Sequence, residues 1–139
     1  MVRQATLSDI PELLRLGRKF HAASPYASMV RFNDEDMTAT LNNLINGAGV
    51  VFKTRHAICG GLITPLLFNH KALVGAELFL FSEKGTGLDV RKAFEKWASD
   101  NGAKYIQMSC LVNTKEKPMR RLFRSFGYDA KEVSFLKVV

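Results

Sequence analysis

The sequence predicts a single small α/β domain, and three observations support this fold class. The chain has 139 residues, 47% of them hydrophobic, which is enough for one well-formed core and too short for two ordinary domains. Segments in which apolar residues recur at helical spacing alternate with apolar segments of strand type. No repeat, linker or low-complexity tract interrupts this order. We therefore expect one domain over residues 1–139.

The first half of the chain should form one strand, two helices and a hairpin. Ser8-Asp9 and Asn33 are of the residue types that cap helices, and Gly47 can end the second helix. Pro65 should stop the second hairpin strand, because proline donates no backbone hydrogen bond. The predicted elements are a strand over Val2–Ala5, helices around Ile10–His21 and Met37–Ile45 separated by a loop over Ala22–Phe32, and strands over Val50–Thr54 and Ile58–Thr64.

The second half is centred on Leu73–Phe81, a segment that is apolar except for Glu77. Such a segment is typical of a strand in the middle of a covered sheet. The elements predicted after it are a helix with Val90, Ala93, Phe94, Trp97 and Ala98 on one face and Asn101-Gly102 at its end, a strand over Ala103–Val112, a helix over Pro118–Phe126, and a final strand over Ser134–Val139.

Several classes of protein are disfavoured by the sequence. The start does not resemble a signal peptide and no apolar segment is long enough to span a bilayer, so we expect a soluble cytoplasmic protein. Cys59 and Cys110 lie in apolar runs, where a reduced, buried cysteine is the commoner state. His21, His56 and His70 are far apart and lack ligand-type neighbours at metal-binding spacing, so we predict no metal.

The chain is basic, with 20 Lys and Arg against 13 Asp and Glu and a formal charge of +7. This balance favours anionic partners such as nucleotides, nucleic acid or acidic substrates. Arg120, Arg121 and Arg124 form the one local cluster. A solvated basic face and a binding surface are both consistent with that cluster.

The turn Ser82-Glu83-Lys84-Gly85-Thr86-Gly87 joins a buried strand to a helix. Its glycines would let the backbone approach an anion, and the free N–H groups of the first helical turn would point at it. The dinucleotide pattern G-x-G-x-x-G fails at Val90, and the P-loop spacing is absent. A pyrophosphate would therefore fit this turn, although a tight turn without a ligand also explains the glycines.

Four pairs of segments carry a family resemblance. They are Val2–Thr6 with Ser8–Leu13, Glu77–Phe81 with Lys84–Leu88, Glu95–Ala98 with Gly102–Lys104, and Asn113 with Arg121–Tyr128. Together these segments resemble the opening, the acetyl-CoA motif and the closing stretch of the GNAT superfamily of acyltransferases, over nearly the whole chain. Within that superfamily the sequence is most similar to short members encoded by bacteriophages, which would act in the host cytoplasm.

The resemblance implies a GNAT fold, with a mixed, mostly antiparallel central sheet flanked by about four helices. It also implies an N-acetyltransferase that takes acetyl-CoA as cosubstrate and transfers the acetyl group directly to a primary amine of a small molecule or a protein. Backbone N–H groups along Phe79–Phe81 would hold the pantetheine arm. The residues that the resemblance implies for cofactor binding are Phe79, Leu80, Phe81, Lys84, Gly85, Thr86, Gly87, Leu88, Asn113 and Phe123.

Two positions depart from the family pattern. Ser82 stands where Gln or Arg is usual, so pyrophosphate binding would depend more on backbone N–H groups and on Lys84. Phe123 stands where many members have a tyrosine that protonates the CoA thiolate, and a phenyl ring has no proton to give. The general acid is therefore unassigned, and the candidates are Ser109, Cys110, Tyr128 or a bound water.

Glu77 is the predicted catalytic residue. A carboxylate in an apolar strand must face a polar cleft or a charged partner, and the family resemblance favours the cleft. Desolvation would raise its pKa towards the range of a useful general base, which would accept the proton of the acceptor ammonium. The alternative is an ion pair with Lys or Arg at a strand edge. Cys110 is interpreted as a core residue rather than a nucleophile, and His21 as a cap or surface histidine.

The sequence is also consistent with two other functions. One alternative is a CoA-binding protein with weak catalysis, which Ser82 and Phe123 would favour. Another is a module that binds nucleic acid or protein through the region of Arg120, Arg121 and Arg124. The acceptor should be chosen by the loops Ala22–Phe32 and Pro65–Ala72, and we expect a monomer or a homodimer.

Overall fold

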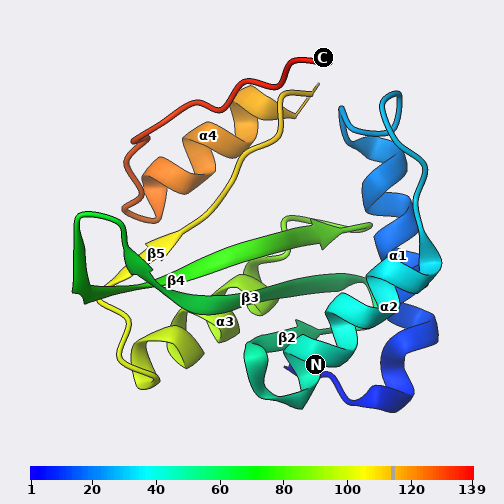
Figure 1. The fold of residues 1–139 in the computed structure, drawn as a ribbon, viewed down its shortest axis with the longest axis horizontal. Helices are drawn as coiled ribbons and strands as arrows, with labels where there is room; N and C mark the ends of the chain where they lie inside the picture. The colour runs from blue at the N-terminus through cyan, green and yellow to red at the C-terminus, as the bar shows by residue number, and fades with distance from the viewer. Residues whose placement is uncertain (114) are drawn as a thin grey trace. The chain divides into compact units, whose positions relative to one another are not determined.

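Figure 1 shows the fold in a computed structural model, which describes residues 1–113 and 115–139. The chain divides into two compact units, Met1–Ser109 and Cys110–Val139. The larger unit holds the β-sheet, and the smaller unit holds the last helix. Across the two described ranges, no helix has both the length and the apolar character needed to cross a bilayer.

The sheet is mixed and mostly antiparallel, as the family resemblance implied. In the described residues it has five strands in the order β1-β2-β3-β4-β5. Each pair from β1 to β4 is antiparallel, and β5 pairs with β4 in parallel. The strands are β1 (Arg3–Gln4), β2 (Val50–Lys53), β3 (Ala57–Leu66), β4 (Asn69–Ser82) and β5 (Tyr105–Gln107).

Helices cover both faces of this sheet (Figure 1). They are the short 3₁₀ turn η1 (Leu7–Asp9), α1 (Ile10–Ala23), α2 (Asp34–Asn43), the π-helical turn η2 (Leu44–Ala48) and α3 (Leu88–Asp100). Asn33 caps α2 as predicted, since its side chain accepts a hydrogen bond from the Asp36 N–H at 2.9 Å. The last helix, α4 (Glu116–Ser125), belongs to the smaller unit.

Two apolar clusters form the core, one on each face of the sheet. Alternation along a strand sends successive side chains to opposite faces. Accordingly, the cluster under α1 and α2 contains Val51 of β2, and the cluster under α3 contains Val50 and Phe52. The largest side chain that is completely buried is Phe94 of α3.

The prediction that Pro65 ends a strand is wrong. β3 continues through Pro65, which pairs with Leu73 of β4. β2 pairs with β3 only as far as Gly61, so beyond that point one edge of β3 has no neighbour in the larger unit. A missing N–H on that edge costs no ladder hydrogen bond. The segment Pro65–Ala72 is therefore the end of a β-hairpin turned at Leu67-Phe68, and not the irregular loop that the sequence predicted.

Two other predicted strands differ from the structure. The strand predicted over Ala103–Val112 is reduced to β5, because its ladder with β4 ends at the pair Ala76 and Gln107. The strand predicted over Ser134–Val139 is wrong, since residues 129–139 are exposed and have no regular secondary structure. Within its unit that segment has no described strand to pair with, and strand composition alone does not make a strand. Pro118 lies in the first turn of α4, which begins at Glu116.

Candidate functional site

A β-bulge in β4 separates the side chains of Glu77 and Phe79. The consecutive residues Gly60-Gly61 of β3 pair with Phe79 and Glu77, so Leu78 has no partner on β3. Phe79 packs in the cluster under α1, whereas a Cβ at Gly61 would meet Phe94 on the α3 face. Because directly paired residues share a face, Glu77 lies on the α3 face. Without the bulge, both side chains would lie on one face.

The strands β4 and β5 separate just beyond this bulge. Their ladder has the pairs Val74 with Tyr105, Gly75 with Ile106 and Ala76 with Gln107. The rest of β4, residues 77–82, is longer than β5 and presents an edge that is unpaired within the larger unit. In that stretch alternate backbone N–H and C=O groups point away from β3. An extended ligand could hydrogen-bond to this edge.

The Glu77 carboxylate lies at the point where the two strands separate. Its Oε1 accepts a hydrogen bond from the Ser109 N–H at 3.4 Å. Burial raises the pKa of Glu77 to about 7 and the hydrogen bond from Ser109 offsets part of this rise. No ion pair to Glu77 occurs in the part of the chain that the structure describes, so the alternative interpretation as a strand-edge ion pair is not what the structure shows.

The turn after β4 has the backbone geometry of an anion site. Gly85 and Gly87 both have positive φ, at 78° and 70°, which other residues rarely adopt. A Cβ on Gly85 would meet no atom within 4 Å, so the turn is open at this position. The first described hydrogen bond of α3 runs from the Arg91 N–H to the Gly87 C=O at 3.1 Å. The N–H groups before Arg91 in the first helical turn are therefore available to an anion.

A pocket of about 340 Å³ opens beside this turn. It lies between the turn and the end of the β2–β3 hairpin. Its lining residues are Thr54, Ala57, Ser82, Lys84, Thr86, Gly87, Leu88, Asp89 and Val90. Lys84 supplies one positive charge, and Asp89 in the first turn of α3 supplies one negative charge. An anion in this pocket would be attracted by the backbone N–H groups and by Lys84, and repelled by Asp89.

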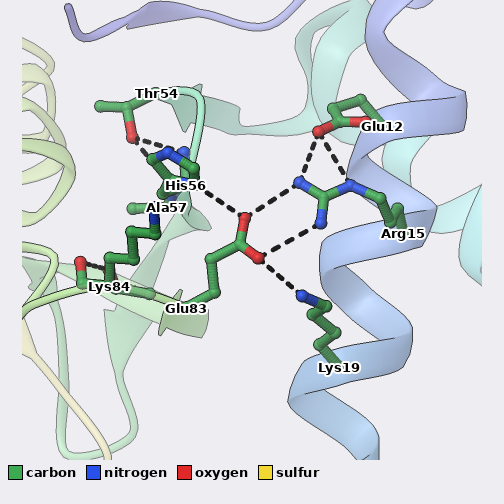
Figure 2. Close-up of polar contacts among 9 residues, drawn as sticks. Glu12, Arg15, Lys19, Thr54, His56, Ala57, Glu83 and Lys84 are labelled. Carbon is green, nitrogen blue, oxygen red and sulfur yellow. Dashed lines mark hydrogen bonds and ion pairs between the residues drawn. The ribbon is translucent and has the colours of Figure 1, made fainter.

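Glu83 is the centre of a charged network on the other side of the turn (Figure 2). Its carboxylate accepts hydrogen bonds from Arg15 at 3.0 Å and from Lys19 at 2.7 Å, both on α1. His56 Nδ1 lies 2.9 Å from the same carboxylate. These three contacts, led by that with Arg15, hold the pKa of Glu83 well below its usual range. Arg15 also bonds to Glu12 at 2.6 Å.

The structure places the predicted cofactor residues of the larger unit on one continuous stretch, from the end of β4 to the start of α3. The side chains of Phe79 and Phe81 pack under α1, with the rings of Phe81 and Phe20 5.6 Å apart, and Leu80 packs on the α3 face. The side chains of these three residues contribute to the core on the two faces of the sheet, whereas their backbone lies on the edge of β4 that is unpaired within the larger unit.

The remaining predicted residues belong to the unit Cys110–Val139. Asn113 accepts a hydrogen bond from the Lys115 N–H at 2.9 Å. Phe123 is buried, and its ring lies 5.6 Å from that of Tyr128. The Cys110 Sγ lies 3.6 Å from the Glu116 C=O, and burial raises the pKa of its thiol, which disfavours the thiolate.

The arginine cluster does not form one uniform surface. Arg120 pairs with Glu116 at 3.2 Å, whereas Arg121 and Arg124 are exposed. Cys59 is buried, and burial strongly raises the pKa of its thiol. No group of three His, Cys, Asp or Glu residues able to hold a metal ion occurs in residues 1–113 or 115–139.

Sequence reasoning missed the network around Glu83. Arg15 and Lys19 are one helical turn apart, which shows from sequence that they share a face of α1. Nothing in the sequence connects that face with Glu83, which lies 64 residues after Lys19. The contact arises only because α1 packs across β4.

Comparison with known proteins supports the fold. No protein-family model matches the sequence, and neither does any curated protein. A solved structure described as a predicted acetyltransferase with acetyl-CoA, from Clostridium acetobutylicum, is similar at TM-score 0.67 and 18% identity, covering 100% of this chain and 95% of that one. A ribosomal-protein-alanine N-acetyltransferase from Brucella melitensis biovar Abortus 2308 gives 0.70 and 13%, with 100% and 99% covered.

A transcriptional regulator from Bacillus halodurans C-125 is also similar, at TM-score 0.73 and 12% identity, with 100% of this chain and 99% of that chain covered. At these identities the likeness concerns the fold. All of these matches extend over the whole chain, and from β1 to α4 the strands and helices follow one another in the predicted order, without the predicted final strand. The protein therefore has the fold of the GNAT superfamily of acetyltransferases.

Proposed function

We propose that the protein is an acetyl-CoA-dependent N-acetyltransferase that acts on a primary amine. The observation that carries this proposal is Glu77, a carboxylate whose pKa is raised to about 7 where β4 and β5 separate. The same strand leads directly into a glycine turn with anion-site geometry. A base on β4 and a phosphate site in the turn that follows it match the needs of acetyl transfer from a nucleotide cofactor.

The cofactor would lie along the residues already predicted from the sequence. The turn Lys84–Leu88 would bind the pyrophosphate through backbone N–H groups and Lys84. The unpaired edge of β4 at Phe79–Phe81 would bind the pantetheine arm through the backbone. The family resemblance adds Asn113 and Phe123 to this set. Bound acetyl-CoA would supply an activated acetyl thioester.

The chain's own chemical contribution is the control of protons and orientation. Glu77 would accept a proton from the acceptor ammonium, directly or through one water, and so leave a neutral amine. The amine nitrogen would then bond to the acetyl carbon as the carbon–sulfur bond breaks, with the thiolate taking up a proton. A thiolate is a good leaving group, so the lack of a tyrosine at Phe123 does not prevent this step.

Thermal unfolding with and without acetyl-CoA tests the cofactor site. At about 100 times its dissociation constant, acetyl-CoA should stabilise the wild type by roughly 2.7 kcal/mol. Gly85→Asp places a carboxylate at the proposed pyrophosphate position and should abolish this stabilisation. Gly102→Asp is the matched control, since Gly102 ends the same helix with φ +92° and should retain the effect. No stabilisation of the wild type would remove the proposal.

Turnover separates catalysis from cofactor binding alone. We would incubate the protein with acetyl-CoA and a panel of primary amines, including small amines and peptides with a free N-terminus, and measure free CoA thiol. Release of CoA that depends on the amine supports an N-acetyltransferase. Stabilisation by acetyl-CoA without any such release would instead favour a CoA-binding protein.

A further inference from the structure

We call the turn Ser82–Gly87 the cofactor turn. Its acidic residue, Glu83, is held by three basic side chains. Glu83 is 14% exposed at its side chain, and its partners Arg15, Lys19 and His56 come from two different parts of the fold. Two of the partners lie on α1, and the third lies in the turn between β2 and β3 (Figure 2). Glu83 therefore connects the start of the cofactor turn to α1 and to the turn between β2 and β3.

The backbone of Glu83 is also fixed by His56, one of the three residues that bind its carboxylate. The Glu83 N–H donates to the His56 C=O at 2.9 Å. The turn that presents His56 is itself ordered, because Thr54 Oγ1 accepts hydrogen bonds from the N–H groups of His56 and Ala57 at 3.2 and 3.0 Å. Glu83 is thus anchored through both its backbone and its carboxylate, at the point where β4 ends.

Glu83 and Lys84 point in different directions. In Figure 2 the Glu83 side chain extends towards α1, whereas the Lys84 side chain extends away from α1, along the side of Ala57. Lys84 lines the pocket at the turn, but Glu83 is not among the residues that line it. The network around Glu83 therefore supports the turn from behind and leaves its open side free for a ligand.

We propose that Glu83 is a positioning residue for the cofactor turn, which fixes the backbone N–H groups of Lys84–Leu88 in the geometry that binds the pyrophosphate of acetyl-CoA. This inference rests on the proposed function of the turn. Each ion pair alone is weak, because Arg15, Lys19 and His56 are between 34% and 53% exposed. Their convergence on one mostly buried carboxylate is what fixes its position.

Glu83 could affect the binding of acetyl-CoA by its charge alone or by positioning the turn. The two explanations predict opposite changes in affinity when Glu83 is replaced, so they can be separated. If Glu83 acted on the cofactor only by its charge, removing that charge would favour an anionic ligand and free three basic groups. Binding of acetyl-CoA would then become tighter. If Glu83 positions the turn, the variant spends less time in the binding geometry, and the apparent affinity falls by the lost fraction.

Isothermal titration calorimetry with acetyl-CoA on the full chain tests the proposal through two variants. Glu83→Gln removes the charge, and Glu83→Asp keeps the charge but shortens the side chain, so that it cannot reach all three partners. Positioning predicts a dissociation constant about tenfold higher in both variants, as expected if the competent fraction falls to about a tenth. Electrostatics alone predicts tighter binding for Glu83→Gln and no change for Glu83→Asp.

Glu12→Gln is the matched control, because it removes the other carboxylate on Arg15 without touching the turn. It should bind acetyl-CoA within about twofold of the wild type. Equal or tighter binding by both Glu83 variants overturns the positioning role. Failure of the wild type to bind acetyl-CoA overturns the proposed function instead. Should Glu83→Gln not fold, Glu83→Asp still decides, since it retains the ion pairs that its length allows.

Discussion

Glu77 combines a polar group with an apolar strand, and the bulge at Leu78 explains how the fold accommodates it. The bulge places Glu77 opposite Gly61 while Phe79 remains in the core under α1. The carboxylate then has one described hydrogen-bond donor, the Ser109 N–H, and no described counter-ion. A carboxylate in this environment favours its protonated form. The loss of stability that comes from ionising a buried carboxylate is expected at a residue that acts as a general base.

Glu77 should make the stability of the protein depend on pH, and Glu77→Gln should remove this dependence. The pKa of Glu77 is raised from 4.5 to about 7 on folding, so the folded state holds a proton that the unfolded chain releases between these values. Stability is therefore fullest below about pH 4.5 and falls as the pH rises to about 7. Above pH 7, Glu77→Gln should be more stable than the wild type by roughly 1–3 kcal/mol, yet inactive.

Thermal unfolding at pH 5 and pH 8, together with the pH profile of kcat/KM, checks this prediction. The wild-type kcat/KM should rise with pH through an apparent pKa near 7, as expected for a general base. Asp100→Asn, which removes an exposed carboxylate paired with Lys96, should alter neither measurement. A Glu77→Gln variant that is destabilised at pH 8 but remains active would assign Glu77 a structural role.

At the scale of elements, α3 packs close to the sheet because glycines face it. A Cβ on Gly75 of β4 would lie 2.5 Å from the Cβ of Ala98, nearer than real Cβ atoms approach. We expect Gly75→Ala to lower the free energy of unfolding by about 1–3 kcal/mol through overpacking. Ala98→Gly should cost about 1 kcal/mol through helix propensity.

The double variant Gly75→Ala with Ala98→Gly tests whether this one contact sets the distance. The second change removes the clash that the first creates, so the double variant should be more stable than additivity predicts, by about 1 kcal/mol. Urea unfolding followed by circular dichroism measures all four proteins. Strictly additive losses would mean that the strain at Gly75 is relieved elsewhere, for example at Ile106, whose Cδ1 is 3.2 Å from the same Cβ.

The same elements show what sequence patterns can and cannot predict. Helices α1, α2 and α3 followed from apolar spacing and caps such as Asn33, because those signals are local. The prediction that Pro65 ends a strand is wrong because proline disrupts a strand only where a neighbouring strand needs its N–H group, and β2 does not extend as far as Pro65. The limits of β5 depend on where β4 bulges, and the network of Glu83 depends on helix packing. These are tertiary properties, which no single segment encodes.

At the scale of the whole molecule, basic charge is concentrated in the last part of the chain. Residues 1–109 have 13 Lys and Arg against 10 Asp and Glu, whereas residues 110–139 have 7 against 3. Each part therefore carries a similar excess, +3 and +4, although the second is much shorter. Exposed apolar side chains are also dense there: Val133, Phe135, Leu136, Val138 and Val139 are all exposed.

Such a density of exposed apolar side chains is unusual for a surface that stays solvated. We predict that the segment Val133–Val139 is buried against a second copy of the chain, which gives a concentration-dependent homodimer. Light scattering should show a molar mass that rises from one chain towards two across a roughly hundredfold range of concentration. Phe135→Asp should keep the protein monomeric, because it places a charge in the apolar contact.

The control for this experiment is Phe68→Asp at the tip of the β3–β4 hairpin. Phe68 and Phe135 are equally exposed, at 93% and 92%, so the two substitutions remove the same apolar surface and add the same charge. Phe68→Asp should leave the association unchanged if the C-terminal segment provides the contact. A wild type that remains monomeric throughout, or a dimer that Phe68→Asp disrupts as strongly as Phe135→Asp, would contradict association through Val133–Val139.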